Sequence, residues 1–252
     1  MEIRIIIAAH KPYWMPEDSM YLPVQVGAAG KESIGFQRDD DGENISGKNE
    51  NYCELTGLYW AWKHVEADWV GLVHYRRHFS GDRRVGNKKA RVIRREELAG
   101  KLNEGTVLLP MPRKYWIETN YSQYAHAHHA KDLEVTREIL GEKCPAYLDA
   151  WDEIMKRTTG HRFNMFVMEK KTLDRYCGWL FGVLAELEKR LDISGYSQND
   201  QRVFGFVSER LLDVWLETEG VPHRDIPYVF MENQNWIVKG MNFIRRKMRA
   251  ED

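Results

Sequence analysis

One short apolar run that ends abruptly in cationic and aromatic side chains constrains this chain more than any other feature. Residues 69–73 have the length and the β-branched content of a strand that is covered on both faces. The residues that follow, 74–78, are rich in histidine and arginine and cannot be buried without anionic partners. A buried strand therefore delivers positive charge to the edge of a sheet, which favours an α/β fold.

The position of this charge indicates a ligand. In open α/β sheets, ligands bind outside the carboxyl ends of the strands. Two adjacent guanidiniums, Arg76 and Arg77, are placed there to meet a phosphate or a pyrophosphate. An ordinary solvated strand end, or pairing of both arginines with the many carboxylates of the chain, would account for the same residues. The segment by itself leaves these interpretations open.

Two other apolar runs end in the same way. Residues 3–9 are followed by His10, Lys11 and a proline, and residues 106–110 are followed by basic and aromatic side chains. Both runs read as strands that proline and polar residues stop. We expect the three strands to present their polar residues at one edge of a mostly parallel sheet. His10 and Lys11 are thus candidate ligand-binding residues, with a solvated loop start as the alternative.

A helix is expected to lead into the central strand. From Asn51 onward, apolar side chains recur at three- and four-residue spacing on one face. The N-terminus of such a helix attracts anions, and it should lie near the loop that holds Asp41 and Asn44. Glu54, early in the helix, could cap the backbone or accept hydrogen bonds from a ligand.

Two clusters invite a metal interpretation. Asp39 and Asp41 have the DxD spacing that holds a divalent metal in many nucleotide-sugar enzymes, but an aspartate-rich turn is more often a solvated loop. His126, His128 and His129 could bind zinc. On a helix, however, the second of these histidines points away from the other two. Histidines of an acceptor cleft or of a helix surface are the alternatives.

The second half of the chain offers one more candidate. Residues 163–168 read as a strand, and residues 171–191 and 203–216 as amphipathic helices. Asp200 lies at the junction that leads into the last of these helices. A carboxylate at such a junction is either an N-cap or a positioned base.

Size and composition narrow the classes of protein. We expect the 252 residues to form a single domain, with residues 1–110 as a nucleotide-sugar-binding half, 111–235 as an acceptor half and 236–252 as a basic tail. A net charge of -1 argues against nucleic-acid binding. The 3 cysteines form no CxxC pair, and no segment resembles a signal peptide or a membrane span, so a cytoplasmic protein is expected. The basic tail could touch an anionic membrane surface.

Several motifs together resemble a known family. The chain is similar to bacterial proteins that are described only as a domain of unknown function, belong to capsular and exopolysaccharide biosynthesis, and are regarded as glycosyltransferases. The resemblance covers nearly the whole chain. The motifs that carry it are AAHKPY (8–13), DGENIS (41–46), YCELTGLYWAWK (52–63), HYRR (74–77), NMF (164–166) and RVFGFVSERLL (202–212).

The resemblance implies a GT-A-like fold and the transfer of a sugar from a nucleotide donor to a growing glycan, with galactofuranose as a donor of some relatives. In that fold, a helix and a strand deliver the DxD pair to the donor pyrophosphate, where this chain instead has residues 74–77. Two guanidiniums could neutralise the leaving diphosphate in place of Mg²⁺ or Mn²⁺. No metal is then required, although Asp39 or Asp41 could still recruit one.

The resemblance also gives Asp200 a role. Enzymes of this fold that invert the anomeric centre place an aspartate or glutamate at the start of a late helix, where it deprotonates the acceptor hydroxyl. Asp200 has that placement and is expected to be the general base of an inverting reaction, with Glu209 as a substitute.

The remaining roles follow from the same resemblance. The expected donor is a UDP-sugar or another nucleotide sugar, and the acceptor is a glycan or a lipid-linked oligosaccharide at the inner face of the membrane, as in capsule, exopolysaccharide or O-antigen synthesis. The donor-binding residues are expected to be His10, Lys11, Asp41, Asn44, Glu54, His74, Arg76 and Arg77. The acceptor-binding residues are expected to be Tyr75, Asn164 and Met165.

Two other classes of protein remain open. A non-catalytic glycan-binding module could use the 9 Trp and 12 Tyr of the chain as stacking surfaces. A metal-dependent hydrolase could use His126, His128 and His129. Release of the nucleotide from a nucleotide sugar would separate a transferase from the first class, and bound zinc would support the second.

Overall fold

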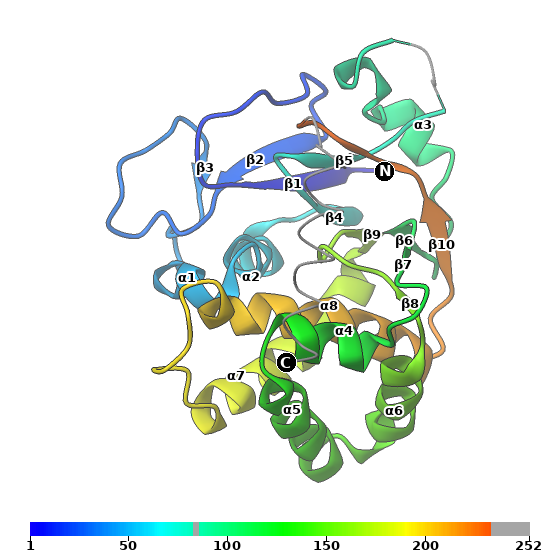
Figure 1. Ribbon diagram of the computed structural model, residues 1–252. Coiled ribbons are helices and arrows are strands. Elements are labelled where there is room, and N and C mark those ends of the chain that lie inside the picture. Colours follow the sequence, from blue (N-terminus) through cyan, green and yellow to red (C-terminus); the bar gives the residue numbers. More distant parts are fainter. Residues whose placement is uncertain (83–85, 233–252) are drawn as a thin grey trace.

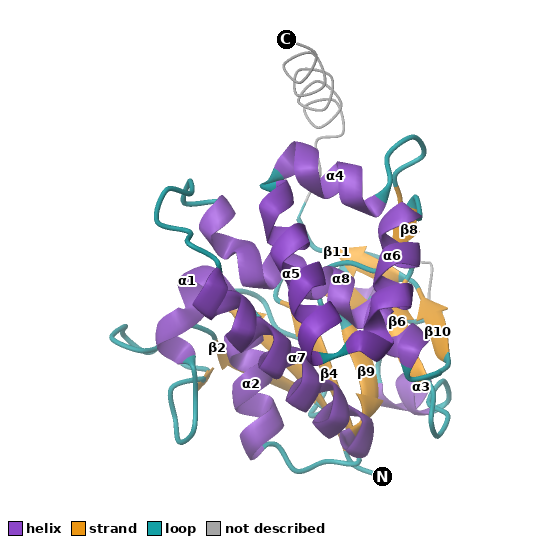
Figure 2. Cartoon of the chain, turned by 90° about the horizontal axis from the view of Figure 1, so that it is seen from below, coloured by secondary structure: helices purple, strands orange, loops and turns teal. Residues whose placement is uncertain are grey.

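The computed structural model describes residues 1–82 and 86–232 (Figure 1). A central sheet is covered on one face by a thick layer of helices, and Figure 2 looks onto that layer with the strands behind it. The strands are β1 (Ile3–Ala9), β2 (Tyr21–Gln25), β3 (Gln37–Arg38), β4 (Trp69–His74), β5 (Arg77–Phe79), β6 (Val107–Pro110), β7 (Arg113–Lys114), β8 (Thr159–Gly160), β9 (Phe166–Glu169), β10 (His223–Ile226) and β11 (Tyr228–Phe230).

The helices fall mostly in the second half of the chain (Figure 1). They are α1 (Asn49–Tyr52), α2 (Leu55–His64), α3 (Arg95–Ala99), α4 (Asn120–Ala127), α5 (Ala130–Lys143), α6 (Leu148–Lys156), α7 (Lys170–Arg190) and α8 (Val203–Thr218). Single 3-10 turns are η1 (Ser46–Lys48), η2 (Lys89–Arg91), η3 (Pro145–Tyr147) and η4 (Asp200–Arg202). No helix of the described residues has the length and apolar composition that a membrane span needs.

The order of the strands explains how distant residues meet. The main path of the sheet runs β10-β6-β9-β4-β1-β2-β3. β1 is parallel to β2 and to β4, whereas β9 is antiparallel to both β4 and β6. β6 therefore runs in the same direction as β4. The carboxyl ends of β1, β4 and β6 lie at one edge, together with the start of β9, as the sequence predicts for a mostly parallel sheet flanked by helices.

The central strands are apolar because both of their faces are covered. Along β1, Ile3, Ile5 and Ile7 pack into one cluster, and the intervening Ile6 and Ala8 pack into the other. This two-residue alternation is that of a pleated strand. Helices α2, α5, α6, α7 and α8 cover one face, while α3, β5, β11 and the loop after β1 cover the other. Each fully buried isoleucine stabilises the fold by about 1.5–3 kcal/mol.

The expected elements are present, with three differences in their course. The strand expected over residues 163–168 begins only at Phe166, because Phe163 and Asn164 form a turn with positive φ values. The helix expected from Asn51 is divided into α1 and α2, because Cys53 has a positive φ of 54° that breaks the helix. The histidines at 126–129 do not share a helix, since α4 ends at Ala127 and α5 begins at Ala130. The basic tail at 236–252 lies outside the described residues.

Candidate functional site

A cavity of about 320 Å³ opens at the edge where β1, β4 and β6 end. Its lining contains six arginines and two glutamates, an excess of four positive charges over a small volume. The arginines are Arg76, Arg77, Arg113, Arg162, Arg202 and Arg210, and the glutamates are Glu54 and Glu209. Guanidiniums at this density favour a multiply charged anion, above all a phosphate or diphosphate.

Several elements contribute to this arginine cavity. Arg76 lies in the tight turn between β4 and β5, Arg77 is the first residue of β5, and Arg162 precedes β9. Arg202, Gly205, Phe206 and Glu209 line the cavity from the N-terminal part of α8. Their spacing of three and four residues places them on one face of that helix. The parallel sheet and one helix thus converge on the cavity.

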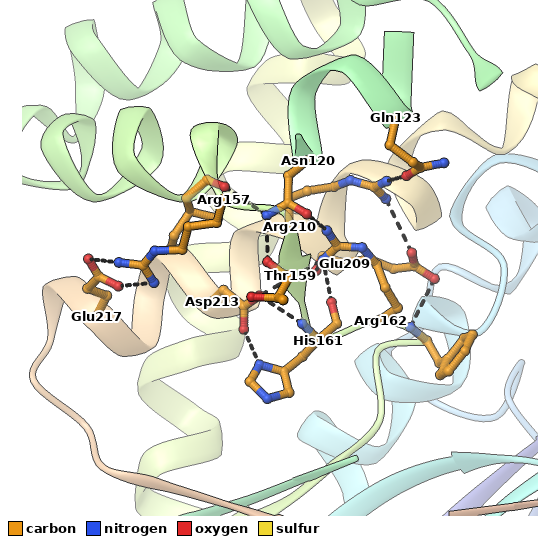
Figure 3. A network of polar contacts seen from close by, with 12 residues as sticks. Asn120, Gln123, Arg157, Thr159, His161, Arg162, Glu209, Arg210, Asp213 and Glu217 are labelled. Atoms are coloured by element: carbon orange, nitrogen blue, oxygen red, sulfur yellow. Dashed lines mark hydrogen bonds and ion pairs between the residues drawn. The ribbon is translucent and has the colours of Figure 1, made fainter. Parts of the chain in front are cut away.

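Arg162 belongs to the wall of the cavity, and the fold uses its whole guanidinium (Figure 3). The side chain is buried and donates to the Tyr115 hydroxyl at 3.0 Å, to the Asn120 side-chain oxygen at 2.5 Å, and to the backbone oxygens of His161 and Glu209. The Asn120 amide in turn donates to two backbone oxygens, which fixes its orientation. Arg162 therefore joins the start of β9 to α4 and α8.

Arg210 has a similar position on α8. It is buried and donates to the backbone oxygen of Phe206 at 2.9 Å, to Glu209 at 3.2 Å and to Gln123 at 2.9 Å. Burial, together with the nearby Arg162 charge, lowers the pKa of Arg210 to about 10, so the group is still a cation at neutral pH. We call Arg162 and Arg210 the inner arginines. Both are held by hydrogen bonds to the protein itself, although Arg210 Nε is buried without a partner among the described residues.

Arg77 differs from the inner arginines in what surrounds it. Its guanidinium lies over the rings of Phe163 and Phe230, 4.3 and 5.0 Å from their centroids, and donates no side-chain hydrogen bond to the described residues. Burial, reinforced by the Arg76 charge, lowers the pKa of Arg77 although Glu209 and Glu54 act in the opposite direction. A half-buried guanidinium with its donors unused is suited to receive an anion.

Arg76 lies beside Arg77, and the protein compensates its charge only slightly more. One of its terminal nitrogens reaches Glu232 only at 3.4 Å, and its Nε is buried without a partner among the described residues. Its guanidinium rests on the Tyr75 ring at 5.1 Å. We call Arg76 and Arg77 the outer arginines. Their positions at the end of β4 are those that the sequence indicates for phosphate contacts.

A second cavity of about 300 Å³ adjoins the first and shares Glu54, His74, Arg76 and Arg202 with it. His10 and Tyr75 also line it. Burial, followed by the charges of Arg76 and other nearby cations, lowers the pKa of His10, so its imidazole is neutral at pH 7. The two cavities together form one elongated cleft with a cationic centre.

Glu54 lines both cavities, and the buried Asn164, which lines neither, holds it in place. The Asn164 amide donates to Glu54 at 2.7 Å and to the backbone oxygen of Gly205 at 3.2 Å, and its oxygen accepts from Ser208 at 3.0 Å. Glu54 makes no side-chain capping bond to α2, so the capping interpretation of this residue is wrong. Gly205 allows a close approach here, because a Cβ would lie 3.2 Å from the Cys53 sulfur, a contact that only a small shift of Cys53 would relieve.

The backbone before β9 is strained where it borders the cleft. Phe163 and Asn164 have positive φ values of 79° and 51°, and Cys53 on the opposite wall has a φ of 54°. Such conformations cost about 1–3 kcal/mol each in non-glycine residues and concentrate at functional sites. The nearby Cys53 thiol is no nucleophile at neutral pH, since burial raises its pKa to about 11.

Asp200 does not line the arginine cavity, but it contacts a residue that does. His128 Nδ1 lies 2.9 Å from an Asp200 oxygen, and the His128 ring stacks on Phe206 in the wall of the cavity. Although burial opposes it, hydrogen bonds from His128 and Ser197 hold the pKa of Asp200 below its ordinary value, so the carboxylate accepts from His128 Nδ1. The N-cap of α8 is Arg202 rather than Asp200.

The protonation state of His128 follows from its surroundings. Burial lowers the pKa of His128 despite the opposing effect of Asp200. The imidazole is therefore neutral at pH 7, with Nδ1 protonated and Nε2 unprotonated. Nε2 makes no hydrogen bond to the described residues. A neutral imidazole that is oriented by a carboxylate and borders a cavity is a competent general base.

Several residues singled out from the sequence lie away from the cleft. Asp41 accepts from Gln37, and the Asn44 amide donates to backbone oxygens of its own loop. Met165 is fully buried in the apolar cluster on the far face of the sheet. Lys11 is exposed, with its ammonium 5.6 Å from the Tyr75 ring centroid. None of these four side chains lines either cavity.

The DxD and histidine clusters have structural partners instead. Asp39 is fully buried and accepts from the backbone nitrogens of Gly27 and Ala28 and from the Ser46 hydroxyl, so it holds a loop together. His126 contacts Glu118 at 2.8 Å, whereas His128 and His129 both face Asp200. The sequence cluster of histidines is thus divided between two carboxylates.

The inner arginines were not among the candidates from sequence. Their partners Asn120 and Gln123 lie on α4, far from β9 and α8 along the chain, and no local pattern links them. A signal was nevertheless present for Arg210. It is a charged residue in a helix that is buried on most sides, and such a charge needs a partner or a ligand.

Comparisons with known proteins identify the family and the fold of the chain. A family model described as a domain of unknown function (DUF4422) matches residues 4–220. The fold is similar to the apo structure of the bifunctional glycosyltransferase WbbM, with a TM-score of 0.86 and 28% sequence identity. This match covers 92% of the present chain and 46% of WbbM, so the chain spans less than half the length of that protein. No curated protein sequence matches the chain.

Proposed function

The chain belongs to the DUF4422 family, and on that premise we propose that it is a glycosyltransferase that takes a sugar from a nucleotide diphosphate donor. The similarity to the glycosyltransferase WbbM supports the reaction class. One observation carries the proposal, namely the cavity of six arginines and two glutamates at the carboxyl edge of the sheet. A lectin site has no need of such a charge, whereas a leaving diphosphate does.

The donor is proposed to lie along the elongated cleft. The outer arginines bind its diphosphate, because their guanidinium donors are largely unused by the protein. The nucleoside occupies the second cavity, beside the neutral His10 and near Glu54. Arg202 borders both cavities and would contact the junction between nucleoside and diphosphate. In this arrangement guanidiniums replace the Mg²⁺ or Mn²⁺ that neutralises the diphosphate in DxD enzymes.

The general base is proposed to be His128, with Asp200 as its positioning residue. This assignment refines the expectation that Asp200 itself is the base, because His128 borders the cavity and Asp200 does not. The carboxylate keeps Nδ1 protonated and so directs the Nε2 lone pair toward the acceptor. Glu209 is a weaker candidate, since its two oxygens accept from the Phe163 backbone nitrogen and from Arg210.

The proposed step is a direct displacement at the anomeric carbon. The oxygen of an acceptor hydroxyl forms a bond to the anomeric carbon while the bond from that carbon to the diphosphate oxygen breaks. The hydroxyl proton moves to His128 Nε2, and the diphosphate leaves with the bonding electron pair. The outer arginines stabilise the negative charge that develops on the leaving group. Direct displacement of this kind inverts the anomeric centre.

The acceptor is proposed to be a glycan, free or lipid-linked, of a capsular, exopolysaccharide or O-polysaccharide pathway. Tyr115 lines the cavity, and the adjacent Trp116 is 83% exposed. Exposed aromatic rings beside a polar cleft suit the apolar faces of sugars. The acceptor would therefore approach from the loop that follows β7, on the side of the cavity away from His10.

A panel of nucleotide sugars tests the proposal. The protein should release nucleoside diphosphate slowly from one donor without an acceptor, and faster with oligosaccharide acceptors, in buffer that contains EDTA. UDP-galactofuranose and UDP-hexoses belong in the panel, with mononucleotide sugars as the control. A glycan-binding module would bind oligosaccharides but release no nucleotide from any donor. That result would overturn the proposed function.

A further inference from the structure

A group of titratable side chains outside the arginine cavity has the composition of a metal site. His161, His223 and Asp225 each offer one ligand atom, and these atoms all lie within 4.8 Å of one another. They come from the segment after β8 and from β10. His223 and Asp225 are two residues apart on one strand, so their side chains project from the same face of it.

The distances between the ligand atoms of this group are close to those between the ligands of a bound metal ion. His161 Nε2 lies 2.9 Å from an Asp225 oxygen, and His223 Nε2 lies 4.0 Å from the same oxygen. A tetrahedral zinc ion with bonds of about 2.0–2.2 Å needs ligand atoms roughly 3.3 Å apart. His161 is almost buried, whereas the His223 side chain is 44% exposed and free to make the small adjustment required.

A further carboxylate orients the buried histidine in the way that metal ligands are oriented. Asp213 on α8 contacts His161 Nδ1 at 2.5 Å and also accepts from the His161 backbone nitrogen at 3.0 Å, a contact visible in Figure 3. With Nδ1 donating to Asp213, His161 Nε2 faces Asp225 and His223, and a metal ion would displace the proton that Nε2 shares with the Asp225 carboxylate. Histidine ligands of zinc almost always donate their other ring nitrogen to such a partner.

The surroundings leave room for an ion and its remaining ligand. An open cavity of about 530 Å³ is lined by His161, His223, Asp225 and Asp213. Water or a small anion can enter it and complete the coordination. Two imidazoles and one carboxylate suit Zn²⁺ and related transition metals, whereas Mg²⁺ and Ca²⁺ prefer oxygen ligands alone.

We propose that His161, His223 and Asp225 form a binding site for a divalent transition metal, with Zn²⁺ as the ion that fits best and Asp213 as the residue that positions His161. The site is separate from the arginine cavity. It is also distinct from the histidines at 126–129, whose partners are Glu118 and Asp200. Because Arg162 follows His161 directly, a bound ion would fasten the segment that carries an inner arginine.

Calorimetric titration of chelator-stripped protein without a polyhistidine tag tests the proposal. Wild-type protein should bind one equivalent of Zn²⁺ and show no heat with Mg²⁺, and Co²⁺ should give visible absorption bands of a tetrahedral site. His223→Ala and Asp225→Asn should each lower the affinity for Zn²⁺ at least tenfold, and Asp213→Asn should lower it by about 10–100-fold. His223 is exposed, so its variant should fold normally, which thermal unfolding without metal checks.

His126→Ala is the matched control, because this histidine is also exposed and paired with one carboxylate. It should bind Zn²⁺ as the wild type does. The proposal is overturned if wild-type protein shows no saturable Zn²⁺ binding, as expected if His161 is only an imidazolium held between Asp213 and Asp225. It is equally overturned if His223→Ala and Asp225→Asn keep wild-type affinity, or if His126→Ala loses it. None of these readouts depends on glycosyl transfer.

Discussion

The inner and outer arginines line one cavity, yet the protein uses them in opposite ways. Arg162 and Arg210 donate to named oxygens of α4, α8 and the segment before β9. Arg76 and Arg77 rest on aromatic rings and leave most of their donors unused by the described residues. Residue type alone therefore does not identify a ligand-binding cation. The state of its hydrogen bonds does.

The difference has an energetic reason. A buried guanidinium whose donors are mostly paired costs less to maintain, and its removal leaves several acceptors unpaired; of the inner arginines, Arg162 donates through all three nitrogens, whereas Arg210 Nε has no partner among the described residues. A half-buried guanidinium without partners costs free energy in the empty protein, and a bound diphosphate recovers that cost. The inner arginines should thus determine stability, and the outer arginines should determine donor binding.

The largest effect on activity is expected from loss of the proposed general base, in variants that leave the outer arginines intact. His128→Ala should lower kcat for transfer by about 10²–10⁴-fold, the usual contribution of a general base. Asp200→Asn should fall in the same range, because an amide no longer keeps His128 Nδ1 protonated. Steady-state kinetics and UDP binding are the measurements. Loss of UDP binding in His128→Ala would show that this side of the cavity also holds the donor.

Removal of an inner arginine should act mainly on folding. Arg162→Ala should lower the free energy of unfolding by about 3–5 kcal/mol, because it leaves the Asn120 oxygen and two backbone oxygens unpaired. Denaturant unfolding measures the loss. Arg137→Ala is the control, since its pair with Asp152 is exposed and should not shift Tm measurably. A stable Arg162→Ala protein with impaired donor binding would reverse the assignment.

Removal of an outer arginine should act mainly on the donor. Arg77→Ala should lower kcat/KM for the nucleotide sugar by about 10–150-fold, which corresponds to the loss of about 1.5–3 kcal/mol from charged hydrogen bonds. Its Tm should change little, because Arg77 pairs with no described carboxylate. Arg77→Lys should recover part of the activity but not all, since an ammonium cannot bind two phosphate oxygens in the planar geometry of a guanidinium.

A smaller effect, on the pH dependence of stability, should come from His78, which follows the outer arginines in the sequence. His78 is buried between the rings of Trp14 and Tyr21, and burial lowers its pKa to about 4. Between pH 6.5 and 4 the unfolded chain takes up a proton that the folded protein does not, so stability falls as the pH falls. The loss from this residue should be about 1.4 kcal/mol at pH 5.5.

Comparison of two pH values isolates this contribution. Wild-type protein and His78→Phe are unfolded by denaturant at pH 7.5 and at pH 5.5, and the change in unfolding free energy is compared. The variant should lose about 1.4 kcal/mol less than the wild type on acidification. Equal losses would mean that His78 takes up the proton in the folded protein as it does in the unfolded chain. A positive charge would then lie next to the outer arginines.

Much of the sheet could be predicted because its signal is local. Residues 69–73 are apolar at every position, as required of a strand that is covered on both faces, and the abrupt change at His74 marks the edge of the sheet. The gathering of His10, Arg76 and Arg77 follows from the parallel pairing of β1 and β4. These features depend on periodicity and on strand direction, which the sequence records directly.

Other parts of the site depend on contacts that no local pattern encodes. The positive φ of Cys53 and the pairing of Asn164 with Glu54 arise from packing between distant segments. Met165 follows Asn164 directly, yet it is fully buried in the apolar cluster on the far face of the sheet, and the left-handed backbone at Phe163 and Asn164 that places it there is not predictable from periodicity. The contact of His128 with Asp200 joins residues 72 positions apart. None of these features could be predicted without the three-dimensional structure.

Calorimetric binding of UDP and UMP in buffer with EDTA tests the central claim most directly. Wild-type protein should bind UDP without metal and more tightly than UMP, because the outer arginines contact both phosphates. In Arg77→Ala, the affinity for UDP should fall far more than the affinity for UMP, so the difference between the two nucleotides should shrink. UDP binding that requires Mn²⁺, or a preference for UDP that is unchanged in Arg77→Ala, would contradict the role of the outer arginines.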